Sequence, residues 1–253
     1  MEATILFPVL NERLRLERGI ETAMAYINRE LKDRCRLMII DNGSTDETPE
    51  IAKKLCGKYP MVSYVRIEER GVGAAFRKGI ALNQSDIVGY MDIDLSTDLK
   101  HLGQTMHLFE TCPEIQYING TRFSRQSDTR GRKWYRQITS QGLLILLKGV
   151  LGMQCTDAVC GFTFVRNEQA RQLTAVCSKE NGWFYTIEFL LRAERMGMRI
   201  LDLPVEWQED YNTTVRIWKT IKNYLIQIVR LKREFWKEDR TKDRQKIGKD
   251  RKR

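Results

Sequence analysis

The chain has 253 residues, of which 42% are hydrophobic, and this is sufficient for one large domain with a sizeable core. It excludes a chain that is disordered over most of its length. Charged residues make up 30% of the sequence and give a formal net charge of +10, and much of the basic excess lies between residues 230 and 253. A basic end of this kind attracts polyanions or anionic lipid headgroups.

Cysteine usage and hydropathy indicate the redox compartment of the protein and its relation to a membrane. The cysteines are scattered without a C-x-x-C pair, which favours neither a zinc site nor a disulfide framework. Residues 5–10 are apolar but follow no basic region, so they predict a strand and not a signal peptide. The longest apolar stretch, 142–151, is interrupted by Lys148 and is shorter than the ~20 residues of a spanning helix. We therefore expect a cytosolic, reduced protein that is peripheral on the cytoplasmic face of a membrane.

Apolar runs of strand length alternate with amphipathic helical patterns through the first half of the chain. Strands are predicted at 5–9, 36–40, 62–67, 87–91 and 115–119, and helices at 11–31, 48–56, 73–82 and 138–151. This alternation is typical of a Rossmann-like α/β fold in which a mostly parallel sheet is flanked by helices. Because no linker rich in Pro, Gly or Ser divides the chain, residues 1–216 are expected to form one domain.

Polar residues follow each of the first four predicted strands, at 11–12, 41–44, 70–71 and 92–94. In open α/β sheets, ligands bind beyond the carboxyl ends of the strands. These loops are therefore expected to converge on one crevice.

Asp92 and Asp94 come directly after the apolar run 87–91. Alternate side chains of an extended chain point the same way, so both carboxylates are expected to face the crevice. Such carboxylates repel each other unless a cation lies between them, and Mg²⁺ or Mn²⁺ suits this oxygen set, with substrate phosphates completing the shell. An Asp-x-Asp sequence also occurs by chance in solvated loops, so the prediction depends on its place after a buried strand.

The other polar loops allow both structural and binding interpretations. Gly43 fits a strand-to-helix turn, whereas Asp41, last on its strand, can accept a hydrogen bond from a nucleobase ring N–H. Glu12 is either part of a helix start or a contact to a base or ribose hydroxyl. For Gly71 and Gly73, we favour close chain packing over a phosphate-binding turn.

Taken together, these segments resemble family 2 glycosyltransferases. The matching segments, in the order typical of that family, are 7–12 (FPVLNE), 41–46 (DNGSTD), 71–75 (GVGAA), 91–95 (MDIDL), 120–122 (GTR), 157–162 (DAVCGF), 183–188 (WFYTIE) and 203–207 (LPVEW). The resemblance extends to about residue 216, and the ordered set is far more specific than any one motif.

The resemblance implies a GT-A fold, a nucleotide-sugar donor, a Mg²⁺ or Mn²⁺ ion and inversion at the anomeric carbon. It assigns the metal to Asp92 and Asp94. It assigns the donor to Pro8, Val9, Asn11, Glu12, Asp41, Gly43, Gly71, Asp92 and Arg216. The chain departs from the pattern at Asn42, where an aspartate is usual, and at Asp210, where the synthases described next often carry an arginine.

Within the family, the chain most resembles dolichyl- and polyprenyl-phosphate mannose or glucose synthases. The sequence DLS at 94–96 matches those enzymes, and Arg122, Arg136 and Ser140 match residues that surround the phosphate of the acceptor lipid. Guanidinium groups bind phosphate in a bidentate manner and remain charged at any working pH. The resemblance implies transfer of a hexose from a UDP- or GDP-sugar to a polyprenyl or dolichyl phosphate, with catalytic roles for Asp94, Arg122, Arg136 and Ser140.

A second interpretation keeps the fold and the metal but transfers the sugar to a hydroxyl of a sugar or protein, as in surface-glycan assembly. A hydroxyl acceptor needs a carboxylate to take its proton, and Glu188 or Asp157 would be the candidate. Glu188 is equally compatible with a position on the surface of a helix at 186–197.

Beyond residue 216, apolar residues recur at helical spacing through 217–236, with basic residues beside them. This helix either packs on the core or lies in a membrane surface, and the basic tail 237–253 is expected to be disordered. A membrane partner protein is a further expectation. We expect no nucleic-acid partner, because no nucleic-acid motif is present and only Phe235 and Trp236 stand near the basic residues.

Overall fold

The computed structural model describes residues 1–130, 134–208 and 217–250. Its centre is a sheet with the strand order β3-β2-β1-β4-β7-β5-β8. These strands are β1 (Ala3–Val9), β2 (Cys35–Asp41), β3 (Val62–Arg66), β4 (Ile87–Met91), β5 (Tyr117–Thr121), β7 (Phe162–Arg166) and β8 (Ile200–Pro204). A second, small sheet pairs β6 (Asp128–Arg130) with β9 (Glu206–Gln208).

The first four strands form a parallel unit. β1 lies between β2 and β4, and β3 extends the sheet beyond β2. The five predicted strands are confirmed within two residues at each end. β7 was not predicted, and it runs antiparallel between β4 and β5. The sheet is therefore mixed, with its parallel half carrying the loops that the sequence singled out.

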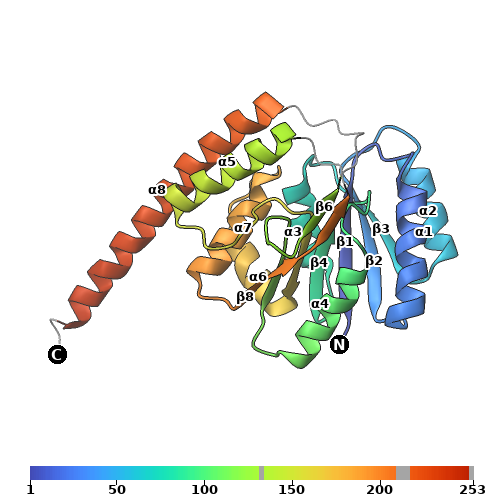
Figure 1. Cartoon of the computed structure of the whole chain (residues 1–253), viewed down its shortest axis with the longest axis horizontal. Coiled ribbons are helices and arrows are strands. Elements are labelled where there is room, and N and C mark those ends of the chain that lie inside the picture. The colour runs from blue at the N-terminus through green and yellow to red at the C-terminus, as the bar shows by residue number, and fades with distance from the viewer. Residues whose placement is uncertain (131–133, 209–216, 251–253) are drawn as a thin grey trace.

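Helices cover both faces of the sheet (Figure 1). They are α1 (Leu16–Tyr26), which continues as a π-helical turn at Ile27–Leu31, and α2 (Thr48–Lys58), α3 (Val72–Leu82), α4 (Lys100–Thr111), α5 (Trp134–Leu151), α6 (Asn167–Val176), α7 (Phe184–Arg195) and α8 (Ile217–Asp250). Alternation along β1 divides the core, since Ile5 and Phe7 pack beneath α1 and α4, whereas Leu6 packs beneath α3 and α7.

The side of α8 that carries Ile228, Leu231 and Phe235 is buried in the core shared with α3 and α7. Helix α8 continues past residue 236, and its bounds reach Asp250. Ion pairs from Glu238 to Arg192 and from Asp239 to Arg195 hold this part of α8 against α7. Figure 1 shows the last turns of α8 projecting from the body of the molecule.

None of the six cysteines, all of them within the described residues, forms a disulfide. No helix in the described ranges combines the length and the apolar character that spanning a bilayer requires.

Candidate active site

The carboxyl ends of β1 and β2 meet where the sequence predicted a crevice. Val9 is in register with Asp41, and the next residue, Asn42, donates its backbone N–H to the carbonyl of Val9. Asn11 donates its N–H to Ser44 Oγ at 2.9 Å, and Gly71 donates its N–H to Asn42 Oδ1 at 3.2 Å. Hydrogen bonds thus join three of the predicted loops directly.

Asp92 and Asp94 follow β4 at the same edge of the sheet. Tyr90 donates its hydroxyl proton to Asp92 Oδ1 at 3.1 Å, and Asp94 Oδ1 accepts the backbone N–H of Ser96 at 3.0 Å. Burial, together with the negative charge of Asp94, raises the pKa of Asp92 to about 7. The surroundings of Asp92 therefore disfavour its charged form, and a cation between the two carboxylates would favour it.

A glycine keeps the space around Asp92 open. A Cβ atom at Gly161 would lie 1.9 Å from Asp92 Oδ2, so no larger residue fits there without moving the carboxylate. The described residues contain no group of three or more His, Cys, Asp or Glu side chains able to hold a metal ion. The oxygen set of Asp92 and Asp94 fits a hard divalent cation whose other ligands come from substrate phosphates and water.

Asp41, at the end of β2, has a fully buried carboxylate with three donors around it. Ser44 donates its N–H to Oδ1 at 2.7 Å, while Tyr64 and Arg66 donate to Oδ2 at 2.9 and 3.3 Å. Burial and the bond to Asp41 raise the pKa of Tyr64 to about 12, so its hydroxyl stays a donor. The side chain of Arg66 remains 40% exposed, which leaves part of its guanidinium accessible to a ligand.

The sequence analysis did not select Tyr64 or Arg66. Both lie on β3, two residues apart, and the register places Arg66 beside Asp41 and Tyr64 beside Ile39. Strand alternation could have placed both on one face of β3. The pairing of β3 with β2, however, was not specified by the local pattern.

Glu12 lies in the loop before α1, because this helix begins only at Leu16. Its backbone N–H is donated to Thr48 Oγ1 at 2.8 Å, and its carboxylate forms an ion pair with Arg15 at 2.7 Å. Pro8 is half-buried and Val9 is buried at the end of β1. The donor-binding roles of these residues and of Asn11 remain predictions.

Gly43, Gly71 and Gly73 adopt backbone conformations or close contacts that a residue with a Cβ atom would not tolerate. Gly43 has a φ of +78° and Gly71 has a φ of +127°. A Cβ atom at Gly71 would lie 2.0 Å from the carbonyl oxygen of Asn181, and one at Gly73 would lie 2.5 Å from Cβ of Tyr185. The structure supports the packing interpretation of Gly71 and Gly73.

Arg122 is largely buried and its guanidinium is already engaged. Nε and Nη2 donate to Asp157 at 2.7 and 3.0 Å, and the guanidinium lies over the ring of Trp207 at 4.9 Å. Burial favours a lower pKa for Arg122, but the Asp157 carboxylate outweighs burial and raises it. In this arrangement Asp157 is not an available general base, because both of its oxygens accept hydrogen bonds from Arg122.

Glu188 fits neither interpretation offered by the sequence. Its carboxylate is fully buried on α7, so it is not a residue of the helix surface. It accepts hydrogen bonds from Ser178, Arg192 and Arg230, which leaves it no free oxygen for a substrate proton. Burial favours a higher pKa, but the bonds from Ser178 and Arg230 outweigh burial and lower the pKa of Glu188. A base role is therefore incompatible with this geometry.

The predicted acceptor residues on α5 are only partly described. Ser140 is half-buried in the second turn of the helix, four residues after Arg136. Residues four apart lie on the same side of a helix, so the backbone places both on one side of α5. The side chain of Arg136 and the whole of Arg216 lie outside the described residues.

The parallel half of the sheet thus brings the buried carboxylate of Asp41 and the carboxylate pair Asp92 and Asp94 to one edge, which is where open α/β sheets bind their ligands. Residues 4–174 match the model of glycosyl transferase family 2. The chain belongs to that family, as the order of its motifs indicated.

Curated relatives agree with this assignment. Glycosyltransferase AglD of Haloferax volcanii is 28% identical over 234 residues, which are 91% of this chain and 37% of AglD. The dolichyl-phosphate beta-glucosyltransferase of Dictyostelium discoideum is 26% identical over 81% of this chain and 66% of its own length. The human dolichyl-phosphate beta-glucosyltransferase is 24% identical over 95% of this chain and 79% of its own length. The chain thus spans only part of each relative.

Solved structures confirm the GT-A fold. Glucosyl-3-phosphoglycerate synthase from Mycobacterium tuberculosis in complex with UDP has a TM-score of 0.69 at 20% identity, covering 91% of this chain and 79% of that one. The same enzyme with Mn²⁺ and UDP-glucose has a TM-score of 0.68 at 19% identity, covering 91% and 78%.

Proposed function

We propose that this chain is a metal-dependent, inverting hexosyltransferase that moves a sugar from a uridine diphosphate donor to a polyprenyl or dolichyl phosphate. The observation that carries the proposal is the pair of carboxylates, Asp92 and Asp94, directly after the buried strand β4, where burial and the charge of Asp94 raise the pKa of Asp92 to about 7. A bound Mg²⁺ or Mn²⁺ would neutralise this pair and the charge that develops on the departing diphosphate.

The surroundings of Asp41 favour uracil over guanine. Guanine presents two neighbouring donors, its N1–H and its amino group, which match a carboxylate with two free oxygens. At Asp41, Oδ1 already accepts the Ser44 N–H, and Arg66 donates to Oδ2. A carboxylate beside a guanidinium matches one N–H next to a carbonyl, which is the pattern of uracil N3–H and O4. The UDP in the names of the related solved structures points the same way.

An anionic acceptor agrees with the state of the buried carboxylates. A phosphate acceptor needs no general base, and the two candidate bases, Asp157 and Glu188, are both bound by arginines. Arg122, Arg136 and Ser140 are the residues proposed to bind the acceptor phosphate. Relatives named as dolichyl-phosphate beta-glucosyltransferases support this choice of acceptor. A lipid acceptor would bring the protein to a membrane surface. We propose that this is the cytoplasmic face, and that a membrane partner protein is present there.

The test is a transfer assay with a short polyprenyl phosphate, UDP-glucose or GDP-mannose, and Mn²⁺. The expected result is a chloroform-soluble sugar from the UDP donor, lost on chelation of the metal. The variant Arg136→Ala separates the acceptors, because it should abolish transfer to a phosphate but only weaken transfer to a hydroxyl. Transfer to 3-phosphoglycerate or to a sugar hydroxyl, with none to the lipid phosphate, would refute the proposed acceptor.

A further inference from the structure

The segment 177–183 connects α6 to α7 and forms neither a helix nor a strand. Because no regular ladder pairs the backbone of such a segment, other groups have to bind it. One of these groups is the fully buried carboxylate of Glu188. Ser178 donates its backbone N–H to Oε1 of Glu188 at 2.9 Å and its hydroxyl to Oε2 at 2.6 Å. Glu188 therefore fixes the start of this segment, which we call the bracing loop.

Further along, the bracing loop binds the first turn of helix α3. The backbone carbonyl of Asn181 accepts the N–H of Gly73 at 2.8 Å and that of Ala74 at 3.3 Å. Arg77 of α3 donates to the backbone carbonyl of Glu180 and to the side-chain oxygen of Asn181. The N–H groups of a first helical turn have no partner within their own helix, so the bracing loop supplies it here.

Helix α3 begins at a turn that belongs to the crevice. Gly71 immediately precedes the helix and donates its N–H to Asn42 Oδ1 at 3.2 Å, in the loop after β2. The bracing loop lies against this turn, since a Cβ atom at Gly73 would be 2.6 Å from the carbonyl oxygen of Glu180. Close-packed groups of this kind cannot move independently. A shift of the bracing loop would therefore shift Gly71.

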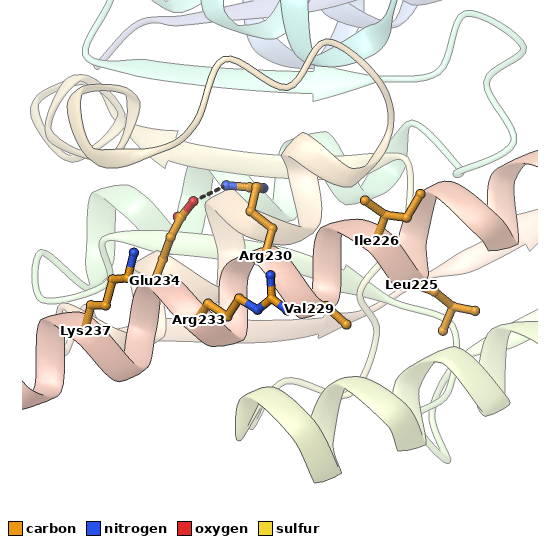
Figure 2. A pocket seen from close by; sticks show the side chains of 7 residues that line it. All are labelled: Leu225, Ile226, Val229, Arg230, Arg233, Glu234 and Lys237. Atoms are coloured by element: carbon orange, nitrogen blue, oxygen red, sulfur yellow. Dashed lines mark hydrogen bonds and ion pairs between the residues drawn. The ribbon is translucent and has the colours of Figure 1, made fainter.

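Helix α8 also binds the carboxylate of Glu188. Arg230 of α8 donates to Oε2 at 2.5 Å and pairs with Glu234 of its own helix at 2.8 Å. Figure 2 shows Arg230 and Glu234 side by side on α8, joined by this ion pair. Arg192 of α7 donates to Oε1 of Glu188 at 3.0 Å. One buried carboxylate thus joins α7, α8 and the bracing loop.

We infer that Glu188 is a positioning residue for the nucleotide: through the bracing loop it holds the turn at Gly71, so that the packing of α8 on α7 sets how tightly the crevice binds a nucleoside diphosphate. Each oxygen of Glu188 accepts two hydrogen bonds, so the residue acts through its partners and not on the substrate.

This inference rests on the proposed function, in which Gly71 belongs to the donor site, and it adds a part of the chain that the family comparison does not reach. Ser178, Glu188 and Arg230 all lie beyond residues 4–174, which match the family model. The helix α8 would then control the affinity of a site with which it has no predicted contact.

Titration calorimetry of the full chain tests the inference, with Mn²⁺ and UDP, or GDP if the wild type binds only that nucleotide. Ser178→Ala removes the hydroxyl that binds Glu188 but leaves both arginine pairs of Glu188 in place. The Kd for the nucleotide should rise about fivefold, because Gly71 then occupies its binding position for a smaller fraction of the time. Ser178→Thr keeps a hydroxyl and should bind the nucleotide like the wild type.

Arg230→Gln tests the contribution of α8. It removes the charged contact between α8 and Glu188, and it should raise the Kd by a similar factor. The matched control is Arg233→Gln, at an exposed arginine of the same helix, and it should bind the nucleotide like the wild type. At saturating UDP-glucose, kcat should change little in either variant, because only the binding of the donor is altered.

Loss of stability alone would not give this pattern. Leu31→Ala opens a cavity at a buried residue just before β2 begins, at the end of the sheet away from the crevice. It should lower the unfolding midpoint more than Ser178→Ala does and leave the Kd unchanged. An equal rise of the Kd in Leu31→Ala and Ser178→Ala would overturn the inference.

The remaining outcomes separate the inference from the proposed function. A wild type that binds neither UDP nor GDP would refute the proposed function and this inference with it. If the wild type binds a nucleotide and Ser178→Ala has an unchanged Kd, only the inference is overturned. A rise of the Kd in Ser178→Ala without one in Arg230→Gln would overturn the part of the inference that concerns α8.

Discussion

The crevice and the contact between α7 and α8 both contain buried carboxylates, but their surroundings differ. Near Asp92, burial and the charge of Asp94 raise the pKa to about 7. Glu188 is bound by Ser178, Arg192 and Arg230, and these bonds lower its pKa despite its burial. The same chemical group therefore serves two purposes: the carboxylates of Asp92 and Asp94 are proposed to bind a cation, whereas that of Glu188 joins two helices through its arginine partners.

The largest effect is expected from the carboxylate pair. Asp92→Asn and Asp94→Asn each remove a proposed metal ligand, and kcat/KM for sugar transfer should fall about 10³-fold or more. Release of nucleoside diphosphate, measured across a Mn²⁺ titration, should also show a requirement for more metal. The control is Asp33→Asn, at an exposed acid after the π-helical turn, and it should behave like the wild type. Full activity in either crevice variant would remove these aspartates from the mechanism.

The next largest effect is expected at Asp157, a buried carboxylate that forms an ion pair with Arg122. In the variant Asp157→Asn, Arg122 keeps its charge but loses an ion pair in which the two side chains are 8% and 0% exposed. The free energy of unfolding should fall by about 3–5 kcal/mol, because a buried charge is left unpaired. Denaturant titration measures the change. Glu30→Gln breaks the exposed pair with Arg29, where we expect a loss below about 1 kcal/mol.

Equal losses in these two variants would contradict the assignment of Arg122 and Asp157 as a buried pair. A combined Arg122→Gln/Asp157→Asn variant should recover part of the lost stability, because it leaves no unpaired charge.

The sequence was sufficient to predict the parallel half of the sheet and the carboxylates at the ends of its strands. Asp41, Asp92 and Asp94 each follow an apolar run whose length and β-branched content predict a buried strand, and strand ends in a parallel sheet meet at one edge. These predictions needed only local information. The antiparallel strand β7 was missed, because which strands pair depends on contacts between segments far apart in the chain.

The sequence was insufficient wherever a side chain's role depends on its partners. Glu188 appeared as a base or a surface residue because its partners Ser178 and Arg230 lie ten and forty-two residues away. The expected disorder from residue 237 rests on composition alone and stays a prediction. Composition does not reveal that Arg192 and Arg195 pair with Glu238 and Asp239 at the start of that segment.

A smaller effect is expected at Glu188, and it depends on pH. Because the folded-state pKa of Glu188 is below its ordinary value of 4.5, its contribution to stability is complete above that pH. The contribution is lost as the pH falls through the folded-state pKa. Glu188→Gln should lower the free energy of unfolding by about 2 kcal/mol at neutral pH, since Glu234 still pairs with both arginines.

Unfolding midpoints measured from pH 7 into the acid range test this prediction. Below the folded-state pKa, the wild type and Glu188→Gln should converge, because both then carry a neutral side chain at this position. Glu168→Gln, at an exposed residue of α6, should follow the wild type at every pH. Curves that stay parallel throughout would show that Glu188 does not stabilise the fold through its charge.

The smallest effect is expected from Arg66, the partner of Asp41. This ion pair is intermediate between the buried pairs of Glu188 and the carboxylates of Asp92 and Asp94, because Asp41 is buried while Arg66 is 40% exposed. If Arg66 donates to uracil O4, Arg66→Ala should raise the KM for UDP-glucose about tenfold and leave kcat nearly unchanged, since one charged hydrogen bond to the base is lost. Arg36→Ala, at an exposed arginine near the start of β2, should leave both constants unchanged. An equal rise in KM for GDP-mannose would show that Arg66 acts only by holding Asp41. The partly open ion pair would then serve the fold, like Glu188, and would not select the base.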